Sequence, residues 1–194
     1  GMLMRRMDEA AGVSTPPRKE GDRVSRYQLT RIIYGTQDVL IAEGVTEHKD
    51  KFVLKRCTTP TAARERTTLR LMKERDSECR HVVRLVDFVG EAEGGGGGSW
   101  LVLELGEYNL AAWLHDRRYA PSWSETLEAG HAIGSALAFV HSQGYVLNDV
   151  KPSNVVRFGA RWKLIDFGAA AEAGAQCVAF TSTYCSPELA RAFL

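Results

Sequence analysis

The chain has 194 residues, of which 44% are hydrophobic and 25% charged, and its formal net charge is +1. This composition is typical of one or two globular domains, and the small net charge argues against nucleic acid or an anionic membrane surface as the main partner. No apolar run approaches the roughly 20 residues that cross a bilayer, and the first residues lack the apolar stretch of a signal peptide. We therefore expect an intracellular protein, of the cytoplasm or nucleus, with four free cysteines.

The first predicted elements are a tail and a hairpin. Residues 1–24 hold a Pro-Pro pair, scattered charge and few large apolar side chains, which predicts a flexible tail. Between Tyr27 and Glu43, two apolar runs flank residues 35–38, G-T-Q-D, and this pattern predicts two strands joined by a turn.

A short strand and a helix follow the hairpin. Residues 52–55, F-V-L-K, are typical of a buried strand that ends in a lysine. Taken alone, such a pattern usually indicates an edge strand whose lysine reaches solvent. Residues 61–75 have helical spacing, with Leu69 and Met72 on one face.

Two further strands are predicted on either side of a glycine run. Residues 82–88 and 100–104 are rich in apolar side chains and are predicted to be neighbouring strands. Residues 94–98, five consecutive glycines, are most simply a flexible connector. The alternative, a phosphate-binding loop, lacks the following helix whose N-terminus would complete an anion site.

The second half of the chain begins with two predicted helices. Residues 109–115 form a short one. Residues 122–125, S-W-S-E, match a capping box, which predicts the start of a longer helix. Its apolar residues recur on one face, and Gly144 ends it as a C-cap.

Four motifs carry the functional information, and their order matters more than any one of them. Residues 147–154 are L-N-D-V-K-P-S-N, and residues 166–168 are D-F-G. Residues 186–188, S-P-E, and residues 52–55 complete the set. D-F-G alone occurs by chance in many proteins, whereas four ordered matches at these distances are very improbable by chance. The chain therefore resembles the eukaryotic protein kinase superfamily and, within it, a Ser/Thr kinase-like domain.

The resemblance implies an α+β fold, with an antiparallel β-sheet N-lobe, one main helix and a mostly helical C-lobe. Residues 25–105 would form the N-lobe and hinge, and residues 106–194 a partial C-lobe with the catalytic loop and activation segment. We expect this C-lobe to be truncated, because the chain stops six residues after Glu188. Glu188 would then be a buried carboxylate without its partner. The uncovered apolar underside would favour a homodimer, or poor order after about Ala169.

The resemblance also implies a site for ATP. Lys55 would hold the α- and β-phosphates and pair with a helical glutamate, for which Glu65 is preferred to Glu74 because apolar residues follow it four and seven positions later. Gly35 would belong to the loop that covers the phosphates, but a plain hairpin turn fits equally well, because two of the usual three glycines are missing. The remaining nucleotide contacts are expected from Val39, Val53, Leu103, Glu104, Gly106 and Val156.

Catalytic and metal-binding roles follow from the same resemblance. Asp166 and Asn154 would supply hard oxygen ligands for Mg²⁺. Asp149 would orient the substrate hydroxyl, and Lys151 would neutralise charge on the migrating γ-phosphoryl group. Thr181 would bridge Asp149 and Lys151, and both Lys151 and Thr181 point to protein substrates phosphorylated on serine or threonine.

Asn148 departs from the family pattern. Arginine is usual here, where its guanidinium pairs with a phosphorylated activation loop, and an amide lacks that charge. Control by loop phosphorylation is therefore not expected. Asn148, together with a phosphate loop that keeps only one of the usual three glycines, favours an alternative function. This alternative is a pseudokinase or scaffold with weak or no nucleotide turnover. A small-molecule phosphotransferase is a lesser alternative, which residues 186–188 disfavour.

Overall fold

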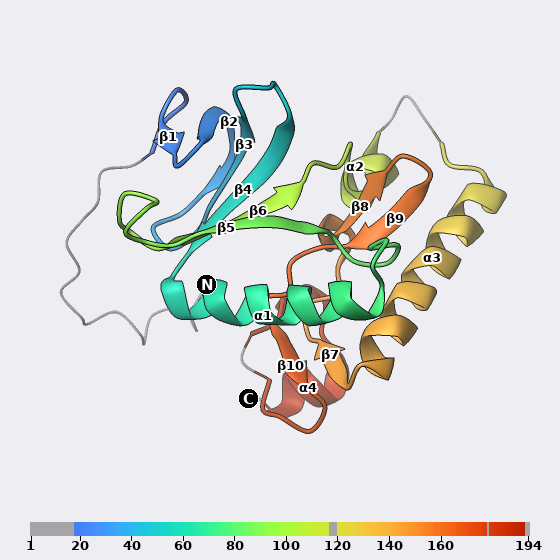
Figure 1. The fold of residues 1–194 in the computed structure, drawn as a ribbon. Coiled ribbons are helices and arrows are strands. Elements are labelled where there is room, and N and C mark those ends of the chain that lie inside the picture. The colour runs from blue at the N-terminus through green and yellow to red at the C-terminus, as the bar shows by residue number, and fades with distance from the viewer. Residues whose placement is uncertain (1–17, 117–119, 178, 193–194) are drawn as a thin grey trace.

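The computed structural model describes residues 18–116, 120–177 and 179–192. Its first half is an antiparallel sheet of six strands in the order β1-β2-β3-β4-β6-β5, with helix α1 lying across it (Figure 1). The strands are β1 (Arg23–Val24), β2 (Tyr27–Gly35), β3 (Leu40–Val45), β4 (Lys51–Cys57), β5 (Leu85–Val89) and β6 (Ser99–Glu104).

The sheet contains the predicted strands, with one difference in position. β4 lies between β3 and β6 and Lys55 is only 8% exposed, which agrees with the role that the ordered motifs imply for Lys55 and not with an edge strand. β5 begins at Leu85, three residues later than predicted, because Val82 and Val83 contact the second half of the chain instead. Val82 forms a bridge with Leu164, and the Val83 N–H donates to the Leu164 carbonyl at 2.9 Å.

The predicted tail over residues 1–24 is too long at its C-terminal end. Residues 1–17 lie outside the described residues. From residue 18 onward the chain contacts the sheet: the Arg18 guanidinium donates to the Gly94 carbonyl at 2.6 Å, and β1 pairs with β2 and buries Val24 completely. A two-residue strand is too short to show periodicity, so it could not be predicted from the pattern of apolar residues.

Helix α1 (Thr59–Arg75) buries Ala62, Glu65, Thr68, Leu69 and Met72. These positions recur at intervals of three and four residues, which places them on one face of the helix. Glu65 is the one charged residue of this face and is 0% exposed. Because a buried charge is costly without a partner, this position already points to an ion pair beneath the sheet.

The second half combines helices with two small two-stranded sheets (Figure 1). The capping box of Ser122 and Glu125 is present, and Gly144 follows the long helix with φ of 78°, as predicted. One two-stranded sheet joins β7 to β10 and another joins β8 to β9. The elements are α2 (Leu110–His115), α3 (Trp123–Ser142), β7 (Tyr145–Leu147), η1 (Pro152–Asn154), β8 (Val155–Phe158), β9 (Arg161–Leu164), β10 (Ala170–Glu172), η2 (Ser182–Tyr184) and α4 (Pro187–Ala192).

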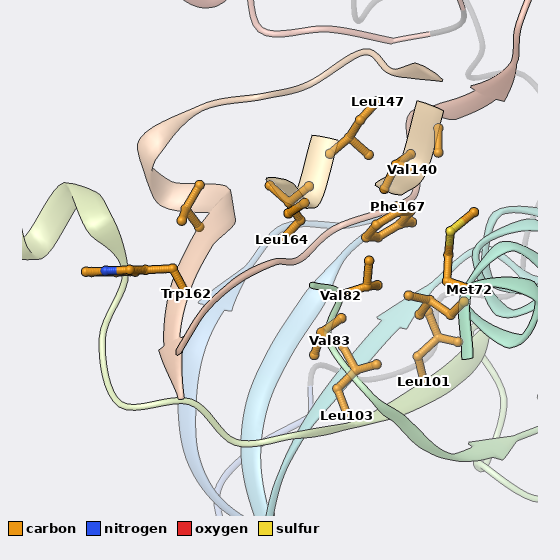
Figure 2. Packing of buried hydrophobic residues seen from close by; sticks show 14 of the residues in the cluster. Met72, Val82, Val83, Leu101, Leu103, Val140, Leu147, Trp162, Leu164 and Phe167 are labelled. Atoms are coloured by element: carbon orange, nitrogen blue, oxygen red, sulfur yellow. The ribbon is translucent and has the colours of Figure 1, made fainter. Parts of the chain in front are cut away.

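A hydrophobic core joins the sheet, α1 and the second half. Figure 2 shows Phe167 between Met72 of α1, Val82, and Leu147 before the catalytic loop. Phe167 is 0% exposed and Leu147 is 5% exposed. Leu147 therefore belongs to the same core as Phe167. This packing fixes the D-F-G turn and the catalytic loop relative to α1.

Three smaller findings bear on the predictions. Glu188 is exposed rather than buried, so the expected cost of an unpaired buried carboxylate does not arise. All four cysteines are free, as predicted. Over the described residues, no helix is both long and apolar enough to cross a membrane.

Candidate active site

The first part of the site is a buried ion cluster below the sheet. The Lys55 Nζ donates to Glu65 Oε2 at 2.8 Å and to Asp166 Oδ1 at 2.6 Å. Glu65 Oε1 also accepts the backbone N–H of Phe167 at 3.1 Å. The cluster thus ties β4, α1 and the D-F-G turn together, and it brings together three of the residues that the sequence singled out. Glu74, the alternative partner of Lys55, is exposed.

The local structure explains why these groups meet. Lys55 stands opposite Ile41 on one side and Leu101 on the other, so it shares the sheet face that α1 covers. Asp166 has a φ of 64°, a conformation uncommon for residues with a side chain. Such strain is sustained where surrounding contacts hold it, and here the buried Phe167 and the ion cluster supply those contacts.

Lys55 is charged in this environment. Burial alone would lower its pKa, but the facing carboxylates of Glu65 and Asp166 outweigh burial and raise the pKa above its ordinary value. The cluster therefore presents a permanent cation with a carboxylate on each side. Asp166, whose side chain is 39% exposed, is the carboxylate that solvent can reach.

The predicted adenine contacts lie on one sheet face and on the segment that follows the sheet. Val53 stands opposite Leu103 across β4 and β6, and Val39 packs against the same core. Gly106 touches Val156 so closely that a Cβ on Gly106 would overlap the Val156 Cγ1 atom. That these five residues hold the adenine ring stays a prediction.

Glu104 has a role that the sequence did not reveal. Its side chain accepts the Lys163 ammonium at 2.6 Å and the Arg84 N–H at 2.7 Å, and Lys163 is only 6% exposed. The Glu104 N–H donates to the Arg84 carbonyl at 3.1 Å, and the expected contact of Glu104 with adenine stays a prediction. The signal that could have found Lys163 is its place between the apolar residues Trp162 and Leu164 of β9.

The turn after Gly35 closes on itself. The Thr36 N–H donates to the Val39 carbonyl at 2.7 Å, and the Val39 N–H donates to the Thr36 hydroxyl at 3.1 Å. These bonds form a hairpin turn, and the expectation that Gly35 belongs to a loop covering the phosphates stays a prediction. The N–H groups of Gln37 and Asp38 are then the ones that this turn would offer to a phosphate.

The second part of the site is the catalytic loop. The Lys151 Nζ donates to Asp149 Oδ2 at 2.7 Å and to the Thr181 hydroxyl at 2.8 Å. Asn154 Nδ2 donates to the Asp149 carbonyl at 2.9 Å. The three residues therefore lie together as expected, but Lys151, rather than Thr181, is the group that joins the other two.

Asp149 is an ionised carboxylate with one free oxygen. Burial favours its protonated form, but the neighbouring Lys151 and Thr181 outweigh burial and lower its pKa below the ordinary value. Oδ1 is buried and accepts no hydrogen bond from the described residues. A buried acceptor without a donor is costly, and a substrate hydroxyl would satisfy it.

The metal-binding expectation rests on Asp166 and Asn154. Among the described residues, no three His, Cys, Asp or Glu side chains gather around one point. The amide nitrogen of Asn154 is used by Asp149, which turns its carbonyl oxygen away from that residue. One carboxylate and one amide oxygen fit Mg²⁺, which commonly takes one or two protein ligands and completes its shell with phosphate and water.

The comparisons with known proteins agree with this arrangement. A family model described as a protein kinase domain matches residues 41–192. MAP kinase-activated protein kinase 2 of Homo sapiens is 32% identical over 151 residues, which are 73% of this chain and 37% of that protein. Serine/threonine-protein kinase PknG of Mycobacterium leprae is 40% identical over 57 residues, 29% of this chain and 8% of that protein.

The chain therefore spans well under half the length of the relatives it matches. The family match nevertheless covers both parts of the site, from β3 to α4. The α+β fold, with its curled sheet, covering helix and catalytic loop, is the one expected from the sequence. The chain belongs to the protein kinase family.

Proposed function

We propose that this chain binds Mg-ATP between the sheet and the catalytic loop and transfers the γ-phosphoryl group to a serine or threonine hydroxyl of a protein. The observation that carries this proposal is the assembled cluster of Lys55, Glu65 and Asp166. Phosphoryl transfer depends mainly on positioning and on neutralising charge, and the cluster supplies a fixed cation beside a metal-binding carboxylate.

The residues divide the work as follows. Lys55 holds the α- and β-phosphates, while Asp166 and Asn154 hold the metal, which neutralises phosphate charge when bound. Asp149 accepts a hydrogen bond from the substrate hydroxyl and takes its proton. The hydroxyl oxygen then bonds to the γ-phosphorus as the bond to the bridging oxygen of ADP breaks. The Lys151 Nζ lies 2.7 Å from Asp149 Oδ2, where it neutralises charge on the migrating γ-phosphoryl group.

Protein substrates are favoured by the Lys151–Thr181 contact of 2.8 Å. It joins the catalytic loop to the segment before Ser186, so a peptide held by that segment would present its hydroxyl to Asp149. On this view residues 25–105 act as the N-lobe and hinge and residues 106–194 as part of the C-lobe. As part of the same proposal, we place this reaction inside the cell, in the cytoplasm or nucleus.

Magnesium-dependent ATP binding tests the first half of the proposal. We expect calorimetric titration to give binding with Mg-ATP and a much weaker signal with ATP and a chelator. An equal signal without the metal would contradict the roles of Asp166 and Asn154. Phosphate transfer to a mixed serine, threonine and tyrosine peptide library then tests the acceptor, and transfer to tyrosine alone would contradict the assignment to serine and threonine.

A pseudokinase or scaffold is the second candidate, and one observation favours it. The closed turn at Thr36 and Val39 leaves few backbone N–H groups for phosphate, and Asp38 adds a negative charge there. Absence of binding at millimolar Mg-ATP would support this function over turnover.

The homodimer expected from the sequence remains a prediction. Helix α3 exposes Trp123 (76%) and Leu127 (54%) one turn apart, and exposed apolar patches often mark interaction sites. Size-exclusion chromatography with light scattering tests it. A monomer at all concentrations would show that these side chains do not join two copies.

A further inference from the structure

Asn148 makes a contact that the proposed roles do not use. Its side-chain Nδ2 donates to the carbonyl of Ala169 at 2.9 Å. Asn148 directly precedes Asp149, and Ala169 directly follows Gly168 of the D-F-G turn. One hydrogen bond therefore joins the residue beside the substrate-facing carboxylate to the turn that carries the metal-binding carboxylate.

This hydrogen bond extends a backbone ladder. β7 and β10 pair antiparallel, with Leu147 opposite Ala170 and Tyr145 opposite Glu172. Asn148 and Ala169 occupy the next position after Leu147 and Ala170, where the two strands separate toward the site. The side-chain amide thus supplies one more link at the point where the backbone ladder ends.

The segment that follows has no cation of its own. Residues 169–188 contain neither lysine nor arginine. Lys151, which touches the far end of the segment at Thr181, is already paired with Asp149. Arg64 lines a hollow of about 400 Å³ beside Ala170 and Ala171. Arg64 is thus a cation beside the start of the segment, and residues 169–180 contain no serine, threonine or tyrosine that could carry a phosphate for it to bind.

We propose that Asn148 is a positioning residue that holds the start of residues 169–184 in place without phosphorylation, and so keeps Asp149 and Asp166 in register. This inference rests on the proposed function for its effect on turnover, but the contact itself is independent of it. A neutral amide donating to a neutral carbonyl needs no added charge, whereas a guanidinium at this position would bring a charge that seeks an anion.

The test compares two substitutions in the whole chain. Asn148→Asp keeps the shape of the side chain but removes the donor and sets a negative oxygen against the Ala169 carbonyl. Asn148→Gln keeps the amide on a longer side chain. Arg64→Ala is the control, because it removes the nearby cation and leaves the Asn148 contact intact. Hydrogen–deuterium exchange of residues 169–173 and turnover of a peptide are measured for each, together with the dissociation constant for Mg-ATP.

We expect Asn148→Asp to speed exchange of residues 169–173 roughly fivefold to tenfold, the effect of one lost hydrogen bond. Its turnover should fall by a similar factor while Mg-ATP affinity stays near the wild-type value. Asn148→Gln should recover most of both losses, and Arg64→Ala should match the wild type. Treatment of the wild type with a phosphatase should leave turnover unchanged.

Three results would overturn the inference: wild-type exchange in Asn148→Asp, equal losses in the Asp and Gln variants, or loss of wild-type turnover after phosphatase treatment. If Asn148→Asp does not fold, Asn148→Ala provides the same comparison with Asn148→Gln. If the wild type binds no Mg-ATP, the proposed function fails, and the exchange rates still decide whether Asn148 holds the segment.

Discussion

The two parts of the site differ in how they are held. In the ion cluster, the side chains of Lys55 and Glu65 are 10% and 0% exposed, and each comes from a different element of the sheet half. In the catalytic loop, Asp149 and Lys151 are 14% and 23% exposed and stand two residues apart. The first part depends on packing between distant segments, whereas the second is largely made by one short loop.

Because of this difference, we expect the ion cluster to contribute mainly to stability and the catalytic loop mainly to catalysis. Removing one member of a buried ion pair leaves its partner charged and unsolvated, which is costly. A pair that solvent reaches contributes little to stability, because water replaces the lost partner. We therefore expect changes at Glu65 to affect folding and nucleotide binding together, and changes at Asp149 to affect turnover almost alone.

The largest expected effect is on turnover in Asp149→Asn. The amide cannot take the proton of the substrate hydroxyl, and a lost catalytic base typically costs 10²–10⁴-fold. We expect peptide phosphorylation to fall roughly 1,000-fold, with the Mg-ATP dissociation constant within about threefold of the wild type. Equal loss of nucleotide binding would show that Asp149 belongs functionally with the ion cluster.

Glu65→Gln should be the most destabilising change. It leaves the buried Lys55 ammonium with Asp166 alone and removes the charge that accepts the Phe167 N–H. We expect a loss of about 3 kcal/mol in the free energy of unfolding, the lower end for a broken buried pair, and weaker Mg-ATP binding. Glu74→Gln, on the exposed side of α1, is the matched control and should change stability by less than about 0.5 kcal/mol.

Gly106→Ala tests whether the adenine gap depends on a close backbone approach. The new Cβ would overlap Val156 Cγ1 and lie 3.0 Å from the Arg157 carbonyl. Overpacking of this kind costs about 1–3 kcal/mol, and the displaced Val156 should also weaken Mg-ATP binding. Gly134→Ala on α3 has open space for its Cβ and should be neutral or stabilising. Unchanged ATP affinity in Gly106→Ala would place adenine elsewhere.

The sequence predicted the catalytic-loop part of the site better than its surroundings. Asp149, Lys151 and Asn154 lie within six residues, so their proximity follows from one loop. The choice of Glu65 over Glu74 also held, because helical spacing decides which glutamate shares a face with Leu69 and Met72. The spacing of residues along one element was therefore sufficient to predict which side chains lie together, wherever that element alone determined the contact.

Contacts between distant segments were not predictable in the same way. The Lys163–Glu104 pair joins residues 59 positions apart, and the Asn148–Ala169 bond joins residues 21 apart. In both pairs, the sequence around one residue does not indicate which distant residue it contacts. The prediction of a flexible tail up to residue 24 was wrong for the same reason. Arg18 is bonded to the glycine turn and Val24 is paired with β2, and both partners are distant or unmarked in the local sequence pattern.

The smallest predicted effect is a pH dependence that separates the two parts of the site. The pKa of Asp149 is lowered in the folded state, so folding favours its ionised form. Its contribution to stability is therefore present above the ordinary carboxylate pKa of the unfolded chain. That contribution is lost as the pH falls through the lower pKa of the folded chain. Lys55 has a raised pKa, so its own deprotonation affects stability only in strongly alkaline solution.

Urea unfolding of the wild type and Asp149→Asn at several pH values between neutral and strongly acidic checks this prediction. Near neutral pH we expect the wild type to be more stable by about 1 kcal/mol, as for a partly exposed ion pair. The difference should vanish in strong acid, because asparagine does not titrate and the protonated Asp149 loses its attraction to Lys151. All other carboxylates cancel in this comparison. A difference that stays constant with pH would show that the two variants differ in packing rather than in charge at Asp149.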